Sequence, residues 1–331
     1  MNAKRIDFVV FYAGKNITED LRNYVLDIRY TDKIGDESDE LEIQLEDSSR
    51  LWQGAWTPSK GDKIQCSIGY FGQPLMNCGT FDVDEITLRG APDVVTIKAL
   101  AAGINSPLRT KRSFAHEDKT MAQIAQAVAQ ANGLTVQGTI PNITFKRITQ
   151  SRETDLAFLN RLASDYGCAF SVRDNQLIFT DFFELDRTEP VLEFSRKDVS
   201  SYDLRDTAVK TYQKAIVAYR EPNTDEVVKY DAKRDIAYYA PAGNDELEVR
   251  EKVENQQQAE RMGNSKLRKA NMEGVTGRLS LEGNTIALAG NTIQMKDDWQ
   301  RFAGKWQISS SSHVLSRSDG YKTDIDIKLI K

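Results

Sequence analysis

Two strand-rich regions on either side of a helical segment constrain this 331-residue chain most strongly. In the first region, every second residue of 41–45, 64–70, 81–83 and 95–99 is apolar. A period of two is typical of strands with one buried face, and the turn sequence at 90–92 predicts a hairpin. Four or more antiparallel strands within about 110 residues, without a helix long enough for a crossover, predict a barrel or sandwich.

The second strand-rich region begins after residue 190 and is similar in size to the first. Its alternating segments are 211–221, 227–235, 277–284, 285–295, 304–315 and 321–330. The first two predict a hairpin turned at Pro222-Asn223. Between the strands, residues 246–271 carry an imperfect apolar stripe on a charged background, which predicts one helix packed on a single face.

The helical segment contains two similar units, Thr120 to Gly133 and Thr154 to Gly167. In each, the threonine is placed to cap a helix and the glycine to end it in a left-handed conformation. The apolar residues expected to form the core of the second unit are Leu156, Leu159 and Leu162. Two copies are too few for a solenoid, so 119–181 is predicted as one small α+β domain that ends in a hairpin turned at Asp174-Asn175.

Composition excludes several classes of protein. The formal net charge is −5 and no dense Lys/Arg run occurs, so no sequence-specific nucleic-acid surface is expected. The N-terminus lacks the pattern of a signal peptide, and no apolar run approaches the about 18 residues of a membrane span. Synthesis in the cytoplasm is therefore expected.

The cysteines and histidines point to structural roles. Cys66, Cys78 and Cys168 lack metal-ligand spacing, which predicts reduced, buried thiols. His116 and His313 lie too far apart in sequence to suggest a catalytic or metal-binding pair. We therefore expect no enzyme activity, no catalytic residue, no metal and no cofactor.

Segment 41–70 resembles the opening barrel of the phage late control protein D family. An alternating strand is followed by Asp47, a short turn with Trp52 and Trp56, and then Gly61-Asp62 before the next strand. These residues are structural or interface candidates by that resemblance. Trp52 and Trp56 fit equally well in contact with a partner or packed over the end of the barrel.

Later segments extend the resemblance over nearly the whole chain. Residues 78–99 are similar to the hairpin that follows in this family, and 153–170 to a helix found there and in the VgrG spikes of type VI secretion. The end of the chain resembles the closing strands of the family, with His313, Tyr321 and Thr323 as further structural candidates. No single motif is diagnostic, but their order and spacing together are specific.

The resemblance implies a mainly β fold with an α+β insert. Two tube-protein-like β-barrels, 1–110 and 190–331, would flank a small LysM-like domain within 111–189, and the second barrel would carry an accessory helix near 246–271. The implied function is a structural baseplate hub of a contractile tail, in a phage, a tailocin or a related injector. Such a hub is a homotrimer whose pseudo-sixfold ring adapts a hexameric tail tube to a trimeric central spike.

The implied partners are the tail tube protein, the central spike protein and baseplate wedge or sheath components, with the tape measure protein as a further candidate. The protein would be made in the cytoplasm of the bacterial host and assembled in the tail baseplate. The insert is expected outside the ring. An alternative function is a peptidoglycan-binding adaptor that acts through the LysM-like insert, which saturable binding of the insert to purified cell wall would favour.

Overall fold

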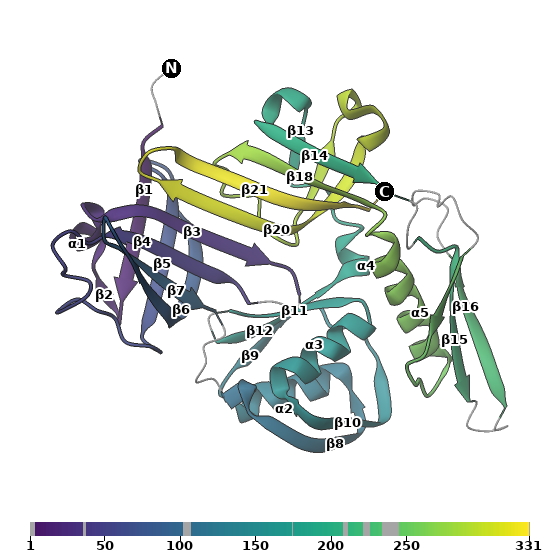
Figure 1. Ribbon diagram of the computed structural model, residues 1–331. Coiled ribbons are helices and arrows are strands. Elements are labelled where there is room, and N and C mark those ends of the chain that lie inside the picture. Colours follow the sequence, from purple (N-terminus) through teal and green to yellow (C-terminus); the bar gives the residue numbers. More distant parts are fainter. Residues whose placement is uncertain are drawn as a thin grey trace.

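The computed structural model describes residues 4–35, 38–101, 107–173, 175–207, 211–220, 226–233 and 245–330. The predicted turn residues Pro222, Asn223 and Asp174 lie outside these ranges. Large antiparallel sheets and few helices make up the described chain, which confirms that the fold is mainly β with a helix-bearing insert (Figure 1).

Residues 4–101 form the first β module. Its elements are β1 (Ile6–Tyr12), β2 (Lys15–Asn16), α1 (Thr18–Arg22), β3 (Val25–Lys33), β4 (Glu40–Glu46), β5 (Lys63–Tyr70), β6 (Met76–Arg89) and β7 (Val94–Leu100). Alternate residues such as Leu41, Ile43 and Leu45 are buried in one apolar core, as the period of two predicts. β6 and β7 form the hairpin predicted across 90–92.

Residues 107–188 form the helix-bearing insert. Its elements are a 3-10 turn (Pro107–Arg109), β8 (Lys111–Thr120), α2 (Met121–Ala131), β9 (Thr135–Gly138), β10 (Thr144–Thr154), α3 (Asp155–Asp165), β11 (Cys168–Arg173), β12 (Gln176–Asp181) and α4 (Phe182–Leu185). The Thr120 and Thr154 side chains each accept a backbone hydrogen bond three residues on, which confirms both predicted caps. Gly133 and Gly167 have φ of +67° and +71°, the predicted left-handed conformation.

The strands of the insert form two small sheets. β8 and β10 pair as a long two-stranded ribbon, which the sequence did not predict at this length. β11 and β12 pair antiparallel, and β9 adds to β12 in parallel. Arg173 pairs with Gln176 across the predicted turn, and Asn175 has φ of +63°, a conformation that asparagine tolerates in turns.

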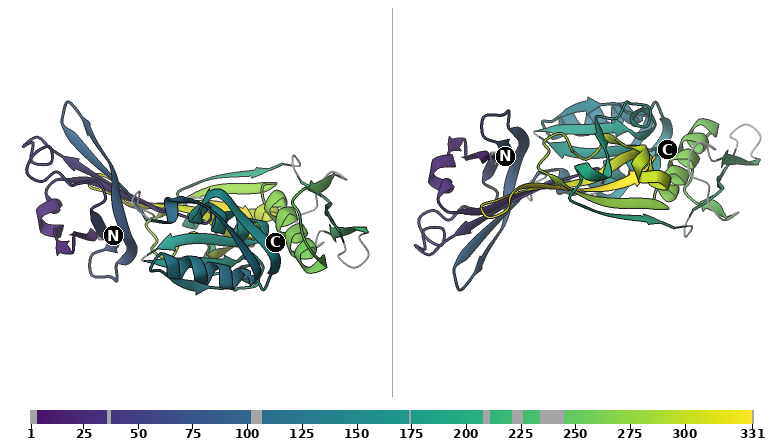
Figure 2. Two further views of the ribbon diagram at one scale, coloured as in Figure 1. Left: turned by 90° about the horizontal axis from the view of Figure 1, so that it is seen from below. Right: turned by 90° about the horizontal axis from the view of Figure 1, so that it is seen from above.

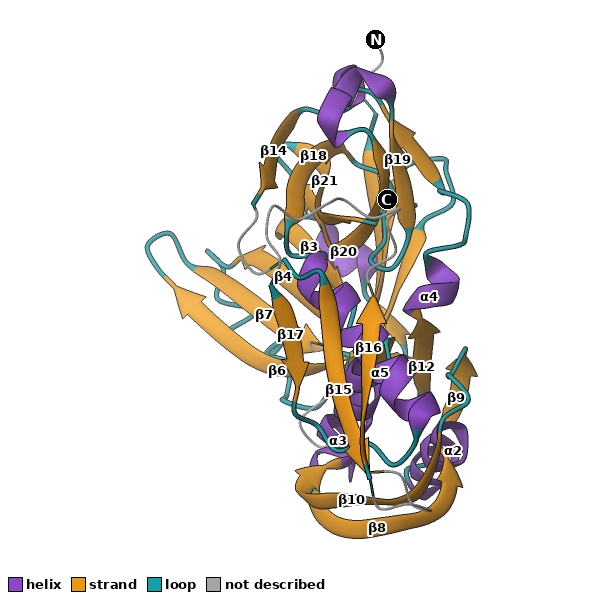
Figure 3. Cartoon of the chain, turned by 90° about the vertical axis from the view of Figure 1, so that its right-hand side faces the viewer, coloured by secondary structure: helices purple, strands orange, loops and turns teal. Residues whose placement is uncertain are grey.

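A sheet and a helix from farther along the chain pack against the insert. β15 (Lys214–Arg220) and β16 (Val227–Lys233) form the predicted hairpin, and β17 (Glu246–Val249) pairs with β15 on its other side. Figure 1 shows α5 (Gln256–Asn271) between this sheet and α3 of the insert, and in Figure 3 β15 and β16 lie in front of α5. One apolar core contains residues of both parts. We call the insert with β15 to β17 and α5 the composite domain.

The helix predicted over 246–271 is shorter in the structure. Its first four residues form β17, and α5 begins only after Asn255, whose side chain accepts a backbone hydrogen bond at the helix N-terminus. The segment 246–249 alternates polar and apolar residues, with Val249 buried. Pairing with β15 therefore decides its conformation.

Residues 190–207 and 275–330 form the second β module. Its elements are β13 (Leu192–Phe194), a 3-10 turn (Arg196–Asp198), β14 (Ser201–Asp206), β18 (Val275–Glu282), β19 (Thr292–Met295), a second 3-10 segment (Asp297–Phe302), β20 (Gly304–Ser316) and β21 (Gly320–Leu329). Trp299 and Trp306 are fully buried in its separate core. The Trp299 indole donates to the Phe194 carbonyl at 2.9 Å, which ties β13 to this core.

The two β modules share one continuous sheet. β20 pairs antiparallel with β3, and His313 lies opposite Tyr30. The resulting layer, which we call the wall, has the order β14-β18-β21-β20-β3-β4-β7-β6, with four strands from each module. Figure 2 shows this sheet running from the first module into the yellow strands of the second.

Candidate assembly site

The two faces of the wall differ in chemistry. On β3 and β4, the paired residues Ile28 and Ile43 are buried in the core of the first module. The next residues along the strands, Arg29 and Glu42, lie on the opposite face, where Lys98 of β7 continues the row. One face therefore rests on the two apolar cores, and the other presents a mixture of charges to solvent.

Both ends of the wall are open among the described residues. Within the described ranges, β14 pairs only with β18. At the other end, β6 pairs with β5 through residues 76–82 and with β7 through 82–89. Residues 84–89, the distal half of β6, thus have β7 on one side and no strand on the other within the described chain. Leu88 in this half is 51% exposed.

A buried polar cluster lies between the two cores of the wall. His313 is fully buried and stacks on Tyr30 at 5.9 Å between ring centroids. Its Nδ1 lies 2.9 Å from the Tyr321 hydroxyl and 3.2 Å from the Thr323 hydroxyl, and its Nε2 lies 3.2 Å from the Ser311 hydroxyl. Burial lowers the pKa of His313 to about 4, so the imidazole is neutral near pH 7.

The predicted candidates His313, Tyr321 and Thr323 therefore lie together, on strands β20 and β21, where the second module joins the first. Tyr321 belongs to the core of the first module, whereas Ile325 on the same strand belongs to the core of the second. The hydrogen bonds of this cluster satisfy the buried hydroxyl groups where the two modules join, and they fix how the modules meet.

A second polar cluster joins the insert to the first module. Arg173, at the end of β11, donates from Nη2 to Asp39 Oδ2 at 2.8 Å and lies 3.6 Å from Asp32 Oδ1. It also donates to the Tyr30 hydroxyl. The backbone N–H of Ala289, from the second module, donates to Asp32 Oδ2 at 3.0 Å. Three parts of the chain thus meet at one pair of buried carboxylates.

Sequence reasoning missed this cluster, although one signal was present. Asp32 continues the apolar face of Ile28 and Tyr30 on β3, and a charged residue on such a face needs a partner. The partner, Arg173, is far away in sequence and follows a strand with no unusual pattern.

The predicted candidates Asp47, Trp52 and Trp56 lie in a turn at one end of the first module. Asp47 is fully buried, and its Oδ1 accepts from the Trp52 backbone N–H at 3.0 Å. Trp52 is buried in the core, whereas Trp56 is 40% exposed. Their rings form an edge contact at 5.3 Å. Trp52 therefore packs in the core of the first module, and Trp56 offers apolar surface at this end of it.

Gly61 and Asp62 close the same turn. Gly61 has φ of +87°, which a residue with a side chain rarely adopts. Asp62 Oδ2 accepts from the Ser59 backbone N–H at 2.9 Å and from the Tyr12 hydroxyl. These hydrogen bonds lower the pKa of the Asp62 carboxyl. Both residues shape the turn before β5.

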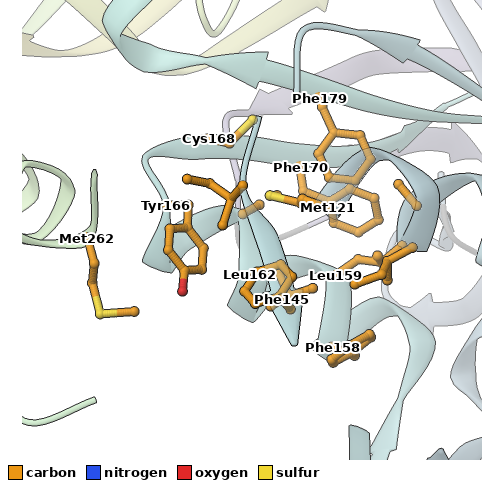
Figure 4. Close-up of a cluster of buried hydrophobic side chains, with 14 of the residues drawn as sticks. Met121, Phe145, Phe158, Leu159, Leu162, Tyr166, Cys168, Phe170, Phe179 and Met262 are labelled. Atoms are coloured by element: carbon orange, nitrogen blue, oxygen red, sulfur yellow. The ribbon is translucent and has the colours of Figure 1, made fainter. Parts of the chain in front are cut away.

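Of the predicted insert core, Leu159 and Leu162 are buried, and Leu156 is partly buried against the same cluster. Figure 4 shows Leu159 and Leu162 among the aromatic side chains of the insert, with Met262 of α5 on the side of Tyr166. The core is therefore shared between the insert and α5.

Cysteines, histidines and acidic residues could also build other kinds of site. Cys66, Cys78 and Cys168 are free and buried, as predicted. No group of three or more His, Cys, Asp or Glu side chains that could hold a metal ion occurs in the described ranges. Among the helices described, none has the length and apolarity needed to span a membrane.

Comparison with known proteins assigns a family. Residues 104–319 match the model of a family described as phage tail baseplate hub (GPD). A "Probable baseplate hub protein" of Escherichia phage 186 is 33% identical over 174 residues, which make up 52% of this chain and 44% of that relative. The matched region thus spans less than half the length of this relative.

Solved structures share the fold at low sequence identity. A tail protein from Neisseria meningitidis MC58 superposes with a TM-score of 0.71 at 14% identity, covering 98% of this chain and 96% of that one. A component of the type VI secretion system of E. coli superposes with a TM-score of 0.57 at 10% identity, covering 93% and 74%. Because the family model covers more than half of the chain, this protein belongs to the phage tail baseplate hub (GPD) family.

Proposed function

We propose that three copies of this chain form the hub ring of a contractile tail, which adapts a sixfold tail tube to a threefold central spike. The observation that carries the proposal is the wall. Each chain contributes two modules, and each module contributes four strands to one continuous antiparallel sheet. Three chains would present six such four-strand sections around a channel, which gives a pseudo-sixfold face from a threefold assembly.

The open ends of the wall are suited to close this ring. Backbone donors and acceptors at a free strand edge favour pairing with another strand. In the proposed ring, β14 of one copy lies beside residues 84–89 of the next. β14 carries Asp203 and Arg205, and the distal half of β6 carries Glu85 and Arg89, so oppositely charged partners are available across the contact.

The charged face of the wall would line the channel. Tyr30 and Asp32, which contact Arg173 of the insert, lie on the core-facing side of β3 rather than on the charged face. Docking of the composite domain on that side leaves the charged face open. In this arrangement the composite domain lies outside the ring, where it would contact wedge or sheath components.

The remaining partners follow from the position of such a ring. The tail tube would stack on its pseudo-sixfold face, the spike on its threefold face, and the tape measure protein is a further candidate within the channel. The particle is assembled from proteins made in the host cytoplasm. Exposed Trp56, at a barrel end, is a candidate contact for a stacked neighbour.

Photo-crosslinking tests the proposed edge contact. Tyr202 on β14 is 48% exposed, so its replacement by benzoylphenylalanine keeps an aromatic ring at that position. In assembled rings we expect crosslinks to residues 84–89 of another copy, identified by mass spectrometry. The matched control is Phe71, which is 60% exposed beyond β5 and lies outside the wall.

The outcome separates two failures. A trimer whose Tyr202 crosslinks map elsewhere would reject this edge assignment but keep the ring. Crosslinks confined to one chain, together with a monomeric mass, would reject the hub proposal itself.

A further inference from the structure

The joint between the insert and the first module holds an unequal number of charges. Asp32 and Asp39 are 7% and 6% exposed, and within the part of the chain that the structure describes Arg173 is the one cation that forms an ion pair with them. With both carboxylates ionised, the buried cluster would carry a net negative charge. An uncompensated buried charge is unfavourable, and one bound proton would remove it.

The other buried groups that face this cluster do not supply the missing positive charge. Tyr30 contacts Arg173 and stacks on His313, whose low pKa keeps it neutral. Burial raises the pKa of both Tyr30 and Cys78, so these groups are neutral as well. The adjacent Lys33 donates its backbone N–H to Asp39 Oδ1 at 3.2 Å, while its side chain follows the opposite face of β3.

Water has a path to the carboxylate pair. A cleft of about 550 Å³ lies between the segment before β4 and the N-terminal turn of α3. Asp39 lines this cleft together with Arg109, Thr154 and Asn160. A proton can therefore exchange with solvent without unfolding either module.

We infer that this joint is a proton-linked latch: the composite domain docks on the first module with Asp32 protonated, and loss of that proton weakens the docking. Arg173 provides the attraction between the two parts. The bound proton removes the repulsion between the two carboxylates, which the single positive charge of Arg173 cannot neutralise. The Ala289 backbone extends the same latch to the second module.

The direction of the pH dependence follows from linkage. Burial first, and then the neighbouring Asp39 carboxylate, raise the pKa of Asp32 to about 7. In the undocked state Asp32 is solvated, and its pKa returns to about 3.9. The docked state therefore binds more protons between these values, so docking is strongest at low pH and weakens as pH rises towards about 7. Above that pH, this group adds no further change.

Hydrogen exchange of the Ala289 amide measures opening of the latch even when the open state is rare, because this N–H donates to Asp32 and undocking of the composite domain exposes Asp32 to solvent. After correction for the intrinsic exchange rate, we expect its protection factor in the full chain to fall by roughly two orders of magnitude from pH 5 to pH 8. Asp32→Asn mimics the protonated carboxyl, so its protection factor should be high and nearly constant over this range. A protection factor independent of pH in the wild type would overturn the inference, and so would an undiminished pH dependence in Asp32→Asn.

Arg173→Met tests whether the composite domain belongs to the latch. This variant should lower Ala289 protection at least tenfold at both pH values. The control is Asp165→Asn, which removes an ion pair with Lys266 inside the composite domain, 2.7 Å in the wild type, and should leave Ala289 protection unchanged. Unchanged protection in Arg173→Met would overturn the inference. If Arg173→Met does not fold, the comparison between the wild type and Asp32→Asn decides whether the inference holds.

Discussion

Leu159→Asp is expected to unfold the composite domain as one unit while both β modules stay folded. Leu159 is 1% exposed in the core that α3 shares with β15 and α5. A buried, unpaired carboxylate costs several kcal/mol, and the lost packing of the leucine adds to this. Hydrogen exchange should show lost protection in α3 and also in α5, about a hundred residues later, with β20 and β21 still protected.

Val227→Asp is the matched control, because Val227 lies in the same domain on β16 but is 61% exposed. It should change stability by less than about 1 kcal/mol. If Leu159→Asp removed protection in the insert alone and left α5 protected, the insert would fold independently of α5 and β15 to β17.

Leu204→Pro is expected to prevent ring formation while leaving the chain folded. The Thr207 N–H donates to the Gly274 carbonyl on the β18 side at 2.8 Å. Because alternate backbone groups of a strand point to opposite sides, the Leu204 N–H faces the free edge of β14. Proline removes this donor and obstructs a neighbouring strand, yet spares the bonds to β18.

Light scattering should give the mass of a single chain for Leu204→Pro, and circular dichroism should remain that of the wild type. Leu204→Ala keeps the backbone donor and serves as the control, which should still form rings. Rings formed by Leu204→Pro would show that β14 does not pair between copies.

Local sequence signals predicted the local structure well. The caps at Thr120 and Thr154 and the turn at Asn175 depend on a few neighbouring residues, and each is found as predicted. The alternation in 41–45 likewise predicted a strand with one buried face. Such signals act within one turn or one strand, so the sequence displays them directly.

Contacts between distant segments were not predictable in the same way. Alternation shows that a strand has a buried face, but not which strand lies beside it. The β17 segment became a strand only because β15 is present, and β20 meets β3 across nearly the whole chain. The shared core of the composite domain and the Arg173 cluster have the same origin, because each depends on residues that folding alone brings together.

The most direct test of the proposed hub is image averaging of the assembled chain by electron microscopy, combined with a mass from light scattering. Three copies should form a closed ring with six β lobes around a channel, and the composite domains should lie on the outside. A monomer both in solution and in the particle would contradict this assembly, as would a ring whose channel contains the composite domain.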